Sequence, residues 1–203
     1  CEEPNAVSIQ GRGAGNGFVT VTRPVYCNES GSTLRFLIPL FSLTAQKIHF
    51  TGAGRLFDRP QAVYQMLFDS QGLRFTQEPD GITVFGRLRP GGFKMPGDVS
   101  SQFISGLMFA APLMESDSLI EVLPPYESRS YVDLTLDAMQ QFGIKVAQRA
   151  RKNGSVVYRI AAPQTYTASD VTIEGDYSQA AFLAVLGCVL GGVTVTGLNP
   201  ESK

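Results

Sequence analysis

Two serines and a glutamine stand in a row at Ser100, Ser101 and Gln102, directly before an apolar run that continues to Leu113. The apolar residues recur at helical spacing, which predicts a buried helix over 99–113 with Ser100 or Ser101 as its N-cap. A helix start has unpaired backbone N–H groups and a partial positive charge. With hydroxyls and an amide beside it, such a start can bind an anion. The serines could equally do no more than cap a core helix, and this stretch leaves both interpretations open.

Other kinds of chemistry have little support in the composition. The 203 residues include one histidine, His49, and three cysteines without metal-ligand spacing. A Ser-His-Asp triad or a His-rich metal site is therefore hard to build, and we expect neither a metal nor a cofactor. The net charge of −1 argues against a nucleic-acid-binding face. No apolar stretch is long enough to span a membrane, and the cysteine pattern favours a reducing compartment, so we expect a cytoplasmic protein.

The elements that must position these residues repeat along the chain. The order helix–strand–helix–strand–strand occurs twice, in units of about 70 residues. Ser32 and Arg59 are separated by the same number of positions as Ser101 and Ser128. We expect the units at 27–90 and 93–162, with strands at 47–51, 73–76, 82–85, 118–123, 144–147 and 156–161 and helices at 30–41, 58–72, 99–113 and 130–141.

Local signals refine this pattern. Pro39 is expected to interrupt the first helix, Asp58 and Pro60 to open the second, and Gly72 and Gly143 to close a helix in each unit. Further strands are expected at 6–10, 18–22 and 193–196, a glycine-rich loop at 11–17, and a last helix after Asp176.

This repeat has a functional consequence. If the units pack around a local axis with their helices parallel, several helix N-termini face one side of the molecule. That side would attract anions through backbone N–H groups and helix dipoles, even at a net charge near zero. The repeat could also be architecture alone, and the pattern does not separate these possibilities.

Five phrases in order, CNESGSTLRFLIPL, GRLFDRP, VSSQFISGLMFAAPL, SYVDLTLDAMQQFG and IEGDYSQAAF, resemble the 5-enolpyruvylshikimate-3-phosphate (EPSP) synthase family. The resemblance covers about Cys27 to Lys203. It implies an α+β fold of repeated βαβαββ units, the inside-out α/β barrel, with helices inside and sheets outside. It also implies a partial first, shikimate-3-phosphate-binding lobe at 1–175, and at 176–203 the hinge and opening helix and strand of a second lobe. The chain begins without Met, and we expect it to be a fragment.

The resemblance implies roles for individual residues. Gly31 lies where the backbone approaches phosphoenolpyruvate closely, and Glu29 beside it has an open role. The residues implied for shikimate 3-phosphate are Ser100, Ser101, Gln102, Ser128 and Tyr131; those implied for phosphoenolpyruvate are Gly31, Arg59 and Gln102, with Ser32 and Arg35 as supports. Asp176 matches the hinge acid and is the candidate catalytic residue. Without the resemblance, Tyr131 would be an ordinary core residue and Arg59 a surface cation.

The implied activity is transfer of the enolpyruvyl group from phosphoenolpyruvate to the 5-hydroxyl of shikimate 3-phosphate, with release of phosphate. In the family the main acid and base belong to the second lobe, so we expect the fragment to bind substrates without turnover. Its partners would be the two substrates and the missing lobe, and the fragment could self-associate although the full enzyme is expected to be a monomer. Two alternatives stay open: a non-catalytic α/β repeat module for a phosphorylated ligand, and the related UDP-N-acetylglucosamine enolpyruvyl transferase.

Overall fold

The computed structural model describes residues 2–3, 6–11 and 20–202. Most of the expected glycine-rich loop at 11–17 and part of the expected strand at 18–22 lie outside these residues. By its internal contacts the chain forms two compact units, 1–168 and 169–203, and each is described by itself. Within the described residues, no helix is long and apolar enough to cross a membrane.

The first unit contains the same four-stranded arrangement twice. One sheet has the order β3-β4-β6-β5 and the other β7-β8-β10-β9. In each sheet the first two strands are parallel and the remaining pairs are antiparallel. The strands are β3 Val25–Tyr26, β4 Lys47–Thr51, β5 Arg74–Glu78, β6 Gly81–Phe85, β7 Gly92–Pro96, β8 Ser118–Leu123, β9 Val146–Ala150 and β10 Val156–Ile160, and β1 Glu2–Glu3 pairs with β2 Ala6–Val7.

Helices connect the strands in the same order in both halves. Along the chain, the first strand of each sheet leads through one helix to the second strand, and the second strand leads through another helix to the third. These helices are α1 Gly31–Phe41, α2 Ala62–Ser70, α3 Ser101–Ala110 and α4 Arg129–Gln141, with the short 3-10 turns η1 Leu56–Asp58 and η2 Ala111–Leu113. Two βαβαββ units follow one another, which confirms the predicted fold class.

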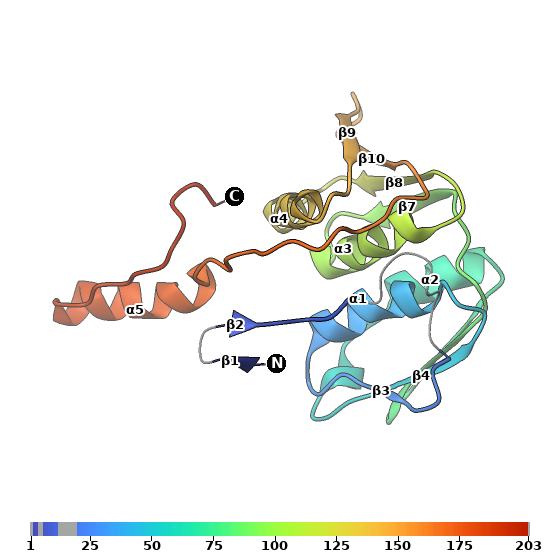
Figure 1. The fold of residues 1–203 in the computed structure, drawn as a ribbon, viewed down its shortest axis with the longest axis horizontal. Coiled ribbons are helices and arrows are strands. Elements are labelled where there is room, and N and C mark those ends of the chain that lie inside the picture. Colours follow the sequence, from blue (N-terminus) through green and yellow to red (C-terminus); the bar gives the residue numbers. More distant parts are fainter. Residues whose placement is uncertain (1, 4–5, 12–19, 203) are drawn as a thin grey trace. The chain divides into compact units, whose positions relative to one another are not determined.

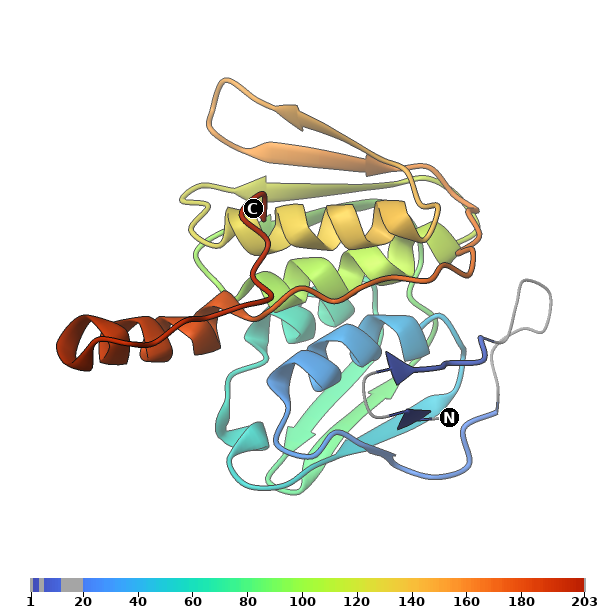
Figure 2. The same ribbon diagram turned by 60° about the vertical axis from the view of Figure 1, so that its left-hand side comes forward.

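The four helices lie between the two sheets (Figures 1 and 2). Each sheet therefore has one face on the helices, and its side chains alternate between buried and more exposed positions. In β4 the buried residues are Ile48 and Phe50, and in β8 they are Ile120 and Val122. The helices are inside and the sheets outside, as the family resemblance implied.

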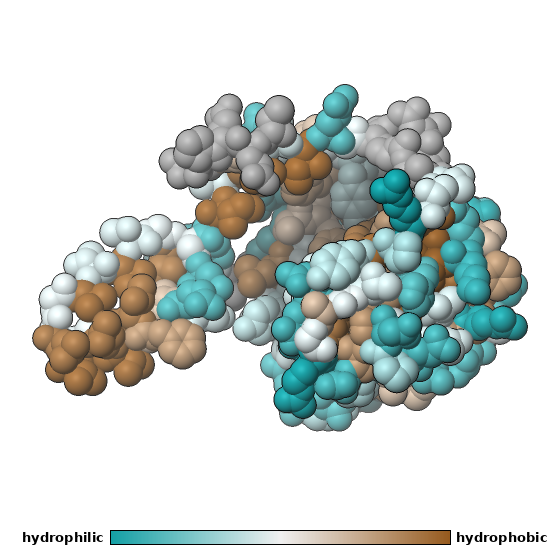
Figure 3. All heavy atoms as spheres, turned by 90° about the horizontal axis from the view of Figure 1, so that it is seen from below, coloured by the Kyte–Doolittle hydropathy of each residue, from teal (hydrophilic) through white to brown (hydrophobic). Residues whose placement is uncertain are grey.

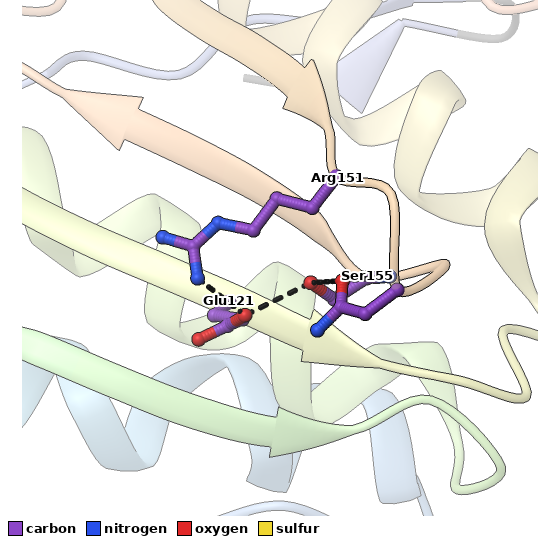
Figure 4. A network of polar contacts seen from close by, with 4 residues as sticks. Glu121, Arg151 and Ser155 are labelled. Atoms are coloured by element: carbon purple, nitrogen blue, oxygen red, sulfur yellow. Dashed lines mark hydrogen bonds and ion pairs between the residues drawn. The ribbon is translucent and has the colours of Figure 1, made fainter.

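The turn between β9 and β10 is tied to the neighbouring strand β8 (Figure 4). The Glu121 carboxylate accepts hydrogen bonds from the Arg151 guanidinium and the Ser155 hydroxyl, each at 2.8 Å. Because Ser155 is fully buried, this network fixes the hairpin that closes the second sheet.

Several elements differ from the sequence prediction. The first helix is not interrupted at Pro39 but continues to Phe41. The second begins at Ala62, after Gln61, so that Asp58 belongs to the preceding 3-10 turn. Strand β7 had not been predicted, and residues 193–196 do not form the expected strand. The helix ends at Gly72 and Gly143 are confirmed, because both glycines have the positive φ that a helix C-terminus requires.

Residues 169–202, the described part of the second unit, contain one helix, α5 Tyr177–Leu190. The Asp176 side chain caps its start, accepting hydrogen bonds from the backbone of Ser178 at 2.7 Å and Gln179 at 3.4 Å. The segment after α5 returns to the segment before it, where Gly175 N–H donates to the Gly197 carbonyl at 2.8 Å. The contact boundary at 168/169 lies within the predicted first lobe, and the lobe boundary near 176 stays a prediction.

Candidate functional site

Helices α1 and α3 run side by side in the same direction. Near their starts, the Gln102 amide donates to the Ser32 hydroxyl at 2.8 Å. Further along both helices, the rings of Phe36 and Phe109 meet edge to face at 5.2 Å. Because contacts advance together along the two helices, both N-termini lie at one end of the helix layer.

The other two helices begin at the same end. The backbone N–H of Glu127, just before α4, donates to the Gly97 carbonyl just before α3, at 3.1 Å. In the first turn of α2, the Tyr64 hydroxyl donates to the Arg35 carbonyl of α1 at 2.7 Å and lies 3.1 Å from the Phe103 carbonyl of α3. Four helix starts therefore gather at one end of the first unit, an arrangement that favours anions.

Gly31, the first residue of α1, lies close to three of the other predicted site residues. A Cβ atom built on it would lie 3.1 Å from Nη1 of Arg59, 3.7 Å from Oε1 of Gln102 and 3.9 Å from Nη1 of Arg35. Two guanidinium groups and an amide thus converge on one helix start. They come from α1, from the loop before α2 and from α3, so the fold brings together residues that are far apart in the sequence.

Arg35 is held firmly although it is a buried cation. Its Nη1 donates to Oε1 of Gln102 at 2.9 Å, its Nε donates to Oε1 of Gln61 at 3.4 Å, and its guanidinium lies 4.4 Å from the centre of the Phe103 ring. Burial lowers the pKa of Arg35, and the nearby charge of Arg59 lowers that pKa further. Among the described residues, neither arginine forms an ion pair with a carboxylate.

The two serines at the start of α3 occupy different structural positions. Ser100 is the N-cap, and its hydroxyl accepts the Gln102 backbone N–H at 3.4 Å. Ser101 is the first helical residue and is buried. Gln102 is oriented by its neighbours, because its oxygen accepts from Arg35 and its nitrogen donates to Ser32.

Ser128 and Tyr131 lie at the start of α4. Ser128 is in the N-cap position, but its side chain makes no capping hydrogen bond. Tyr131 is 58% exposed, so the alternative that it is a core residue is wrong. Both residues lie at the helix-start end, and their predicted role in binding a ligand stays a prediction.

The open question of Glu29 has a structural answer. Its carboxylate accepts the backbone N–H of Arg55 at 3.0 Å. It lies directly against Gly54, whose φ of 59° and missing side chain allow this contact. The negative charge of Glu29 is therefore used to hold the loop that precedes η1.

Asp176 belongs to the second unit, where its carboxylate caps α5. Its predicted catalytic role stays a prediction. Groups of three or more His, Cys, Asp or Glu side chains that could hold a metal ion do not occur in the part of the chain that the structure describes.

Two contributors to the site were not predicted from the sequence. Gln61 and Tyr64 are 1% and 0% exposed, respectively, and both contact Arg35. Tyr64 follows the apolar spacing of a helix core, so periodicity indicates packing and gives no sign of its hydroxyl bonds. The signal that could have located them is the buried arginine, because a buried cation requires polar partners.

Comparison with known proteins identifies the family of this chain. The family model for EPSP synthase (3-phosphoshikimate 1-carboxyvinyltransferase) matches residues 2–203. The 3-phosphoshikimate 1-carboxyvinyltransferase of Clostridium kluyveri is 43% identical over 201 residues, which are 98% of this chain and 45% of that protein. That of Clostridium botulinum strain Alaska E43 is 42% identical over 186 residues, 91% of this chain and 42% of that protein. The chain thus spans less than half the length of these relatives.

A solved structure supports the fold independently. The EPSP synthase of Acinetobacter baumannii superposes with a TM-score of 0.62 over 79% of this chain and 35% of that one, at 20% sequence identity. The match over residues 2–203 and the repeated βαβαββ units agree on one conclusion. The chain belongs to the EPSP synthase family.

Proposed function

We propose that this chain supplies part of the substrate site for enolpyruvyl transfer from phosphoenolpyruvate to the 5-hydroxyl of shikimate 3-phosphate. The proposal is supported by the family and by the names of relatives such as the Clostridium kluyveri enzyme. The single observation that carries it is the pair of cations around Gly31, because Arg35 and Arg59 approach one helix start without a carboxylate partner among the described ion pairs.

Two guanidinium groups near a bare helix start suit a phosphorylated carboxylate. Arg59 would bind phosphoenolpyruvate through charge-assisted hydrogen bonds, and the missing side chain of Gly31 would let the ligand approach the backbone. Gln102 would lie at the boundary between the two substrates. Ser32 and Arg35 would support Gln102, as their hydrogen bonds to its amide suggest.

The second substrate fits the neighbouring helix starts. The phosphate of shikimate 3-phosphate would bind Ser100 and Ser101 at the start of α3 and Ser128 at the start of α4, where helix dipoles favour negative charge. Tyr131, exposed beside Ser128, would pack against the ring or the phosphate.

The reaction requires a proton donor, a proton acceptor and fixed anions. The methylene carbon of phosphoenolpyruvate gains a proton, and the 5-hydroxyl oxygen adds to the adjacent carbon with loss of its own proton. The tetrahedral intermediate then loses one proton from the methyl group formed in the first step, together with inorganic phosphate, which restores the carbon–carbon double bond. The residues gathered here would orient and neutralise the anions, a contribution that lowers the barrier through positioning. Asp176 is proposed as a catalytic carboxylate, and the main acid and base are proposed to belong to the second lobe.

Titration of the 203-residue chain with phosphoenolpyruvate and shikimate 3-phosphate, followed by amide NMR, tests the proposal. We expect shifts at the starts of α1, α3 and α4. Arg59→Ala should weaken phosphoenolpyruvate binding by about tenfold, and Ser101→Ala should weaken shikimate 3-phosphate binding. Arg87→Ala is the matched control, because Arg87 is exposed and paired with Glu115. Shifts away from the helix starts would contradict the proposed site.

A turnover assay separates the remaining alternatives. We expect binding without turnover for these residues alone, and turnover at the rate of a complete enzyme would contradict the division of labour between lobes. Equal binding of any phosphate compound would favour a non-catalytic module, and binding of UDP-N-acetylglucosamine would favour the related transferase.

We place the protein in the cytoplasm, with the second lobe as its partner.

A further inference from the structure

Pro39 leaves a gap in the hydrogen bonding of α1. In an α-helix the N–H of residue 39 would donate to the carbonyl of Arg35, but proline has no N–H. The Arg35 side chain is buried, so its backbone lies in a part of the molecule where an unpaired carbonyl is costly. The carbonyl therefore needs another donor.

Tyr64 supplies that donor from α2. Its hydroxyl donates to the Arg35 carbonyl at 2.7 Å, and the Phe103 carbonyl of α3 lies 3.1 Å from the same oxygen. The side chain is fully buried, and burial raises the pKa of Tyr64 well above the usual value, so the hydroxyl stays protonated and able to donate. One hydroxyl thus joins α2 to the backbones of α1 and α3.

Gly106 of α3 makes room for this contact. A Cβ atom at Gly106 would overlap both the Arg35 carbonyl oxygen and the Tyr64 hydroxyl. The close approach of the three helices at this point therefore requires that residue 106 has no side chain.

The side chain of Arg35 is fixed from the same three helices. Gln61 beside α2 and Gln102 of α3 accept its hydrogen bonds, and it lies over the Phe103 ring. The Tyr64 ring meets that same Phe103 ring edge to face at 4.9 Å. A shift of the Arg35 backbone would therefore change the position of the guanidinium relative to Gly31.

We propose that Tyr64 is a positioning residue for Arg35 and acts through the carbonyl that Pro39 leaves without a donor. We call this hydrogen bond between the Tyr64 hydroxyl and the Arg35 carbonyl the lock, and it sets the anion affinity of the helix-start site. The inference rests on the proposed function. It goes beyond it by assigning a role to two buried residues that touch no substrate.

The test is a rescue experiment on the full chain with phosphoenolpyruvate as ligand. Tyr64→Phe removes the hydroxyl and should weaken phosphoenolpyruvate binding about fivefold, the size expected for one lost hydrogen bond. Pro39→Ala restores an N–H at position 39, so the double variant Pro39→Ala/Tyr64→Phe should recover binding to within about twofold of the original chain. Pro39→Ala alone should leave binding unchanged.

Tyr166→Phe is the matched control. The Tyr166 hydroxyl also donates to a carbonyl of α3, that of Phe109 at 3.0 Å, but near the other end of the helix. Its loss should leave phosphoenolpyruvate affinity unchanged. A double variant that binds as weakly as Tyr64→Phe would overturn the proposal, because a general packing defect would not be repaired by an N–H at position 39.

A readout without ligand keeps this test separate from the proposed function. Hydrogen exchange of the Arg35 Nε–H group, followed by NMR, reports how firmly the guanidinium is held. We expect exchange to become about fivefold faster in Tyr64→Phe and to return in the double variant. If the original chain binds no phosphoenolpyruvate, the proposed function fails. The exchange measurement still shows whether Tyr64 positions Arg35. Unchanged exchange in Tyr64→Phe would refute the lock.

Discussion

Gly31 is the residue on which the two arginines converge, and its lack of a side chain can be tested directly. In Gly31→Ala the new methyl group would lie 3.1 Å from Nη1 of Arg59, so the flexible end of that arginine must move by a few tenths of an ångström. We expect phosphoenolpyruvate affinity to fall about threefold while the free energy of unfolding changes by less than about 1 kcal/mol, since alanine is the better helix former. Calorimetric titration and urea unfolding measure the two effects. A large loss of stability with unchanged affinity would contradict this prediction.

Asp117 gives the unfolding free energy a dependence on acid pH. The backbone N–H of Ala162 and then the guanidinium of Arg159 hold the pKa of Asp117 below its usual value of 3.8. The carboxylate therefore stabilises the folded chain above about pH 4, and this contribution is lost as the pH falls through the lowered pKa. Urea unfolding should show Asp117→Asn less stable than the original chain at pH 6, with the difference shrinking toward pH 3. Arg159→Gln should reduce the pH dependence of the free energy of unfolding. A stability difference between the original chain and Asp117→Asn that does not change with pH would contradict this prediction.

The sequence indicates the site residues that lie near helix starts better than those that act through contacts between helices. Gly31, Arg59 and Gln102 were predicted, and the structure brings them together. The family resemblance implied them, and each belongs to a short motif that is local in the sequence. Gln61 and Tyr64 could not be found in this way, since their roles depend on polar contacts between different helices. Periodicity predicts that such residues are buried but does not identify their hydrogen-bond partners.

At the scale of elements, the close contact between α1 and α3 depends on Gly106. Gly106→Ala would press a methyl group against the Arg35 carbonyl and the Tyr64 hydroxyl, and both are held by other bonds. We expect the free energy of unfolding to fall by about 2 kcal/mol, a typical cost of overfilling a packed interior. Gly92→Ala is the control, because nothing lies within 4 Å of a Cβ at that position. Equal stability of the two variants in urea unfolding would contradict the prediction.

Most elements follow from local sequence, and those that differ have physical reasons. α1 continues through Pro39 because its position near the helix end limits the damage and Tyr64 replaces the lost donor. β7 is short, and its alternation of buried Phe93 and Met95 with exposed Lys94 is the signal that could have predicted it. Residues 193–196 have an apolar strand-like composition, but within the described unit they form no strand ladder.

At the scale of the whole molecule, the repeat explains why the helix starts gather. Each βαβαββ unit places its helices on one face of its sheet, and packing the two helix layers together aligns their N-termini. The repeat was predictable because equal spacings separate corresponding residues in the two units. The packing of one βαβαββ repeat on the other was not predictable, since it depends on side-chain contacts such as that between Phe36 and Phe109.

The exposed apolar side chains of α5 lead us to expect that the chain self-associates. Phe182, Val185 and Val189 are 74%, 65% and 76% exposed, and Figure 3 shows apolar residues gathered on this helix. Apolar patches of this kind mark surfaces that a partner covers. A helix that is apolar on all sides is normally buried. We therefore expect sedimentation velocity to show association that increases with protein concentration.

Charge placed on that surface should reverse the association, because a lysine would have to be buried in the contact without a partner. Val189→Lys should shift the chain toward monomer, whereas Gln179→Lys adds the same charge at an exposed polar position of the same helix and should leave association unchanged. If both variants dissociate equally, net charge rather than the apolar surface controls the assembly. If the original chain is monomeric at every concentration, the apolar surface of α5 stays in contact with solvent and is not an association surface in the isolated chain.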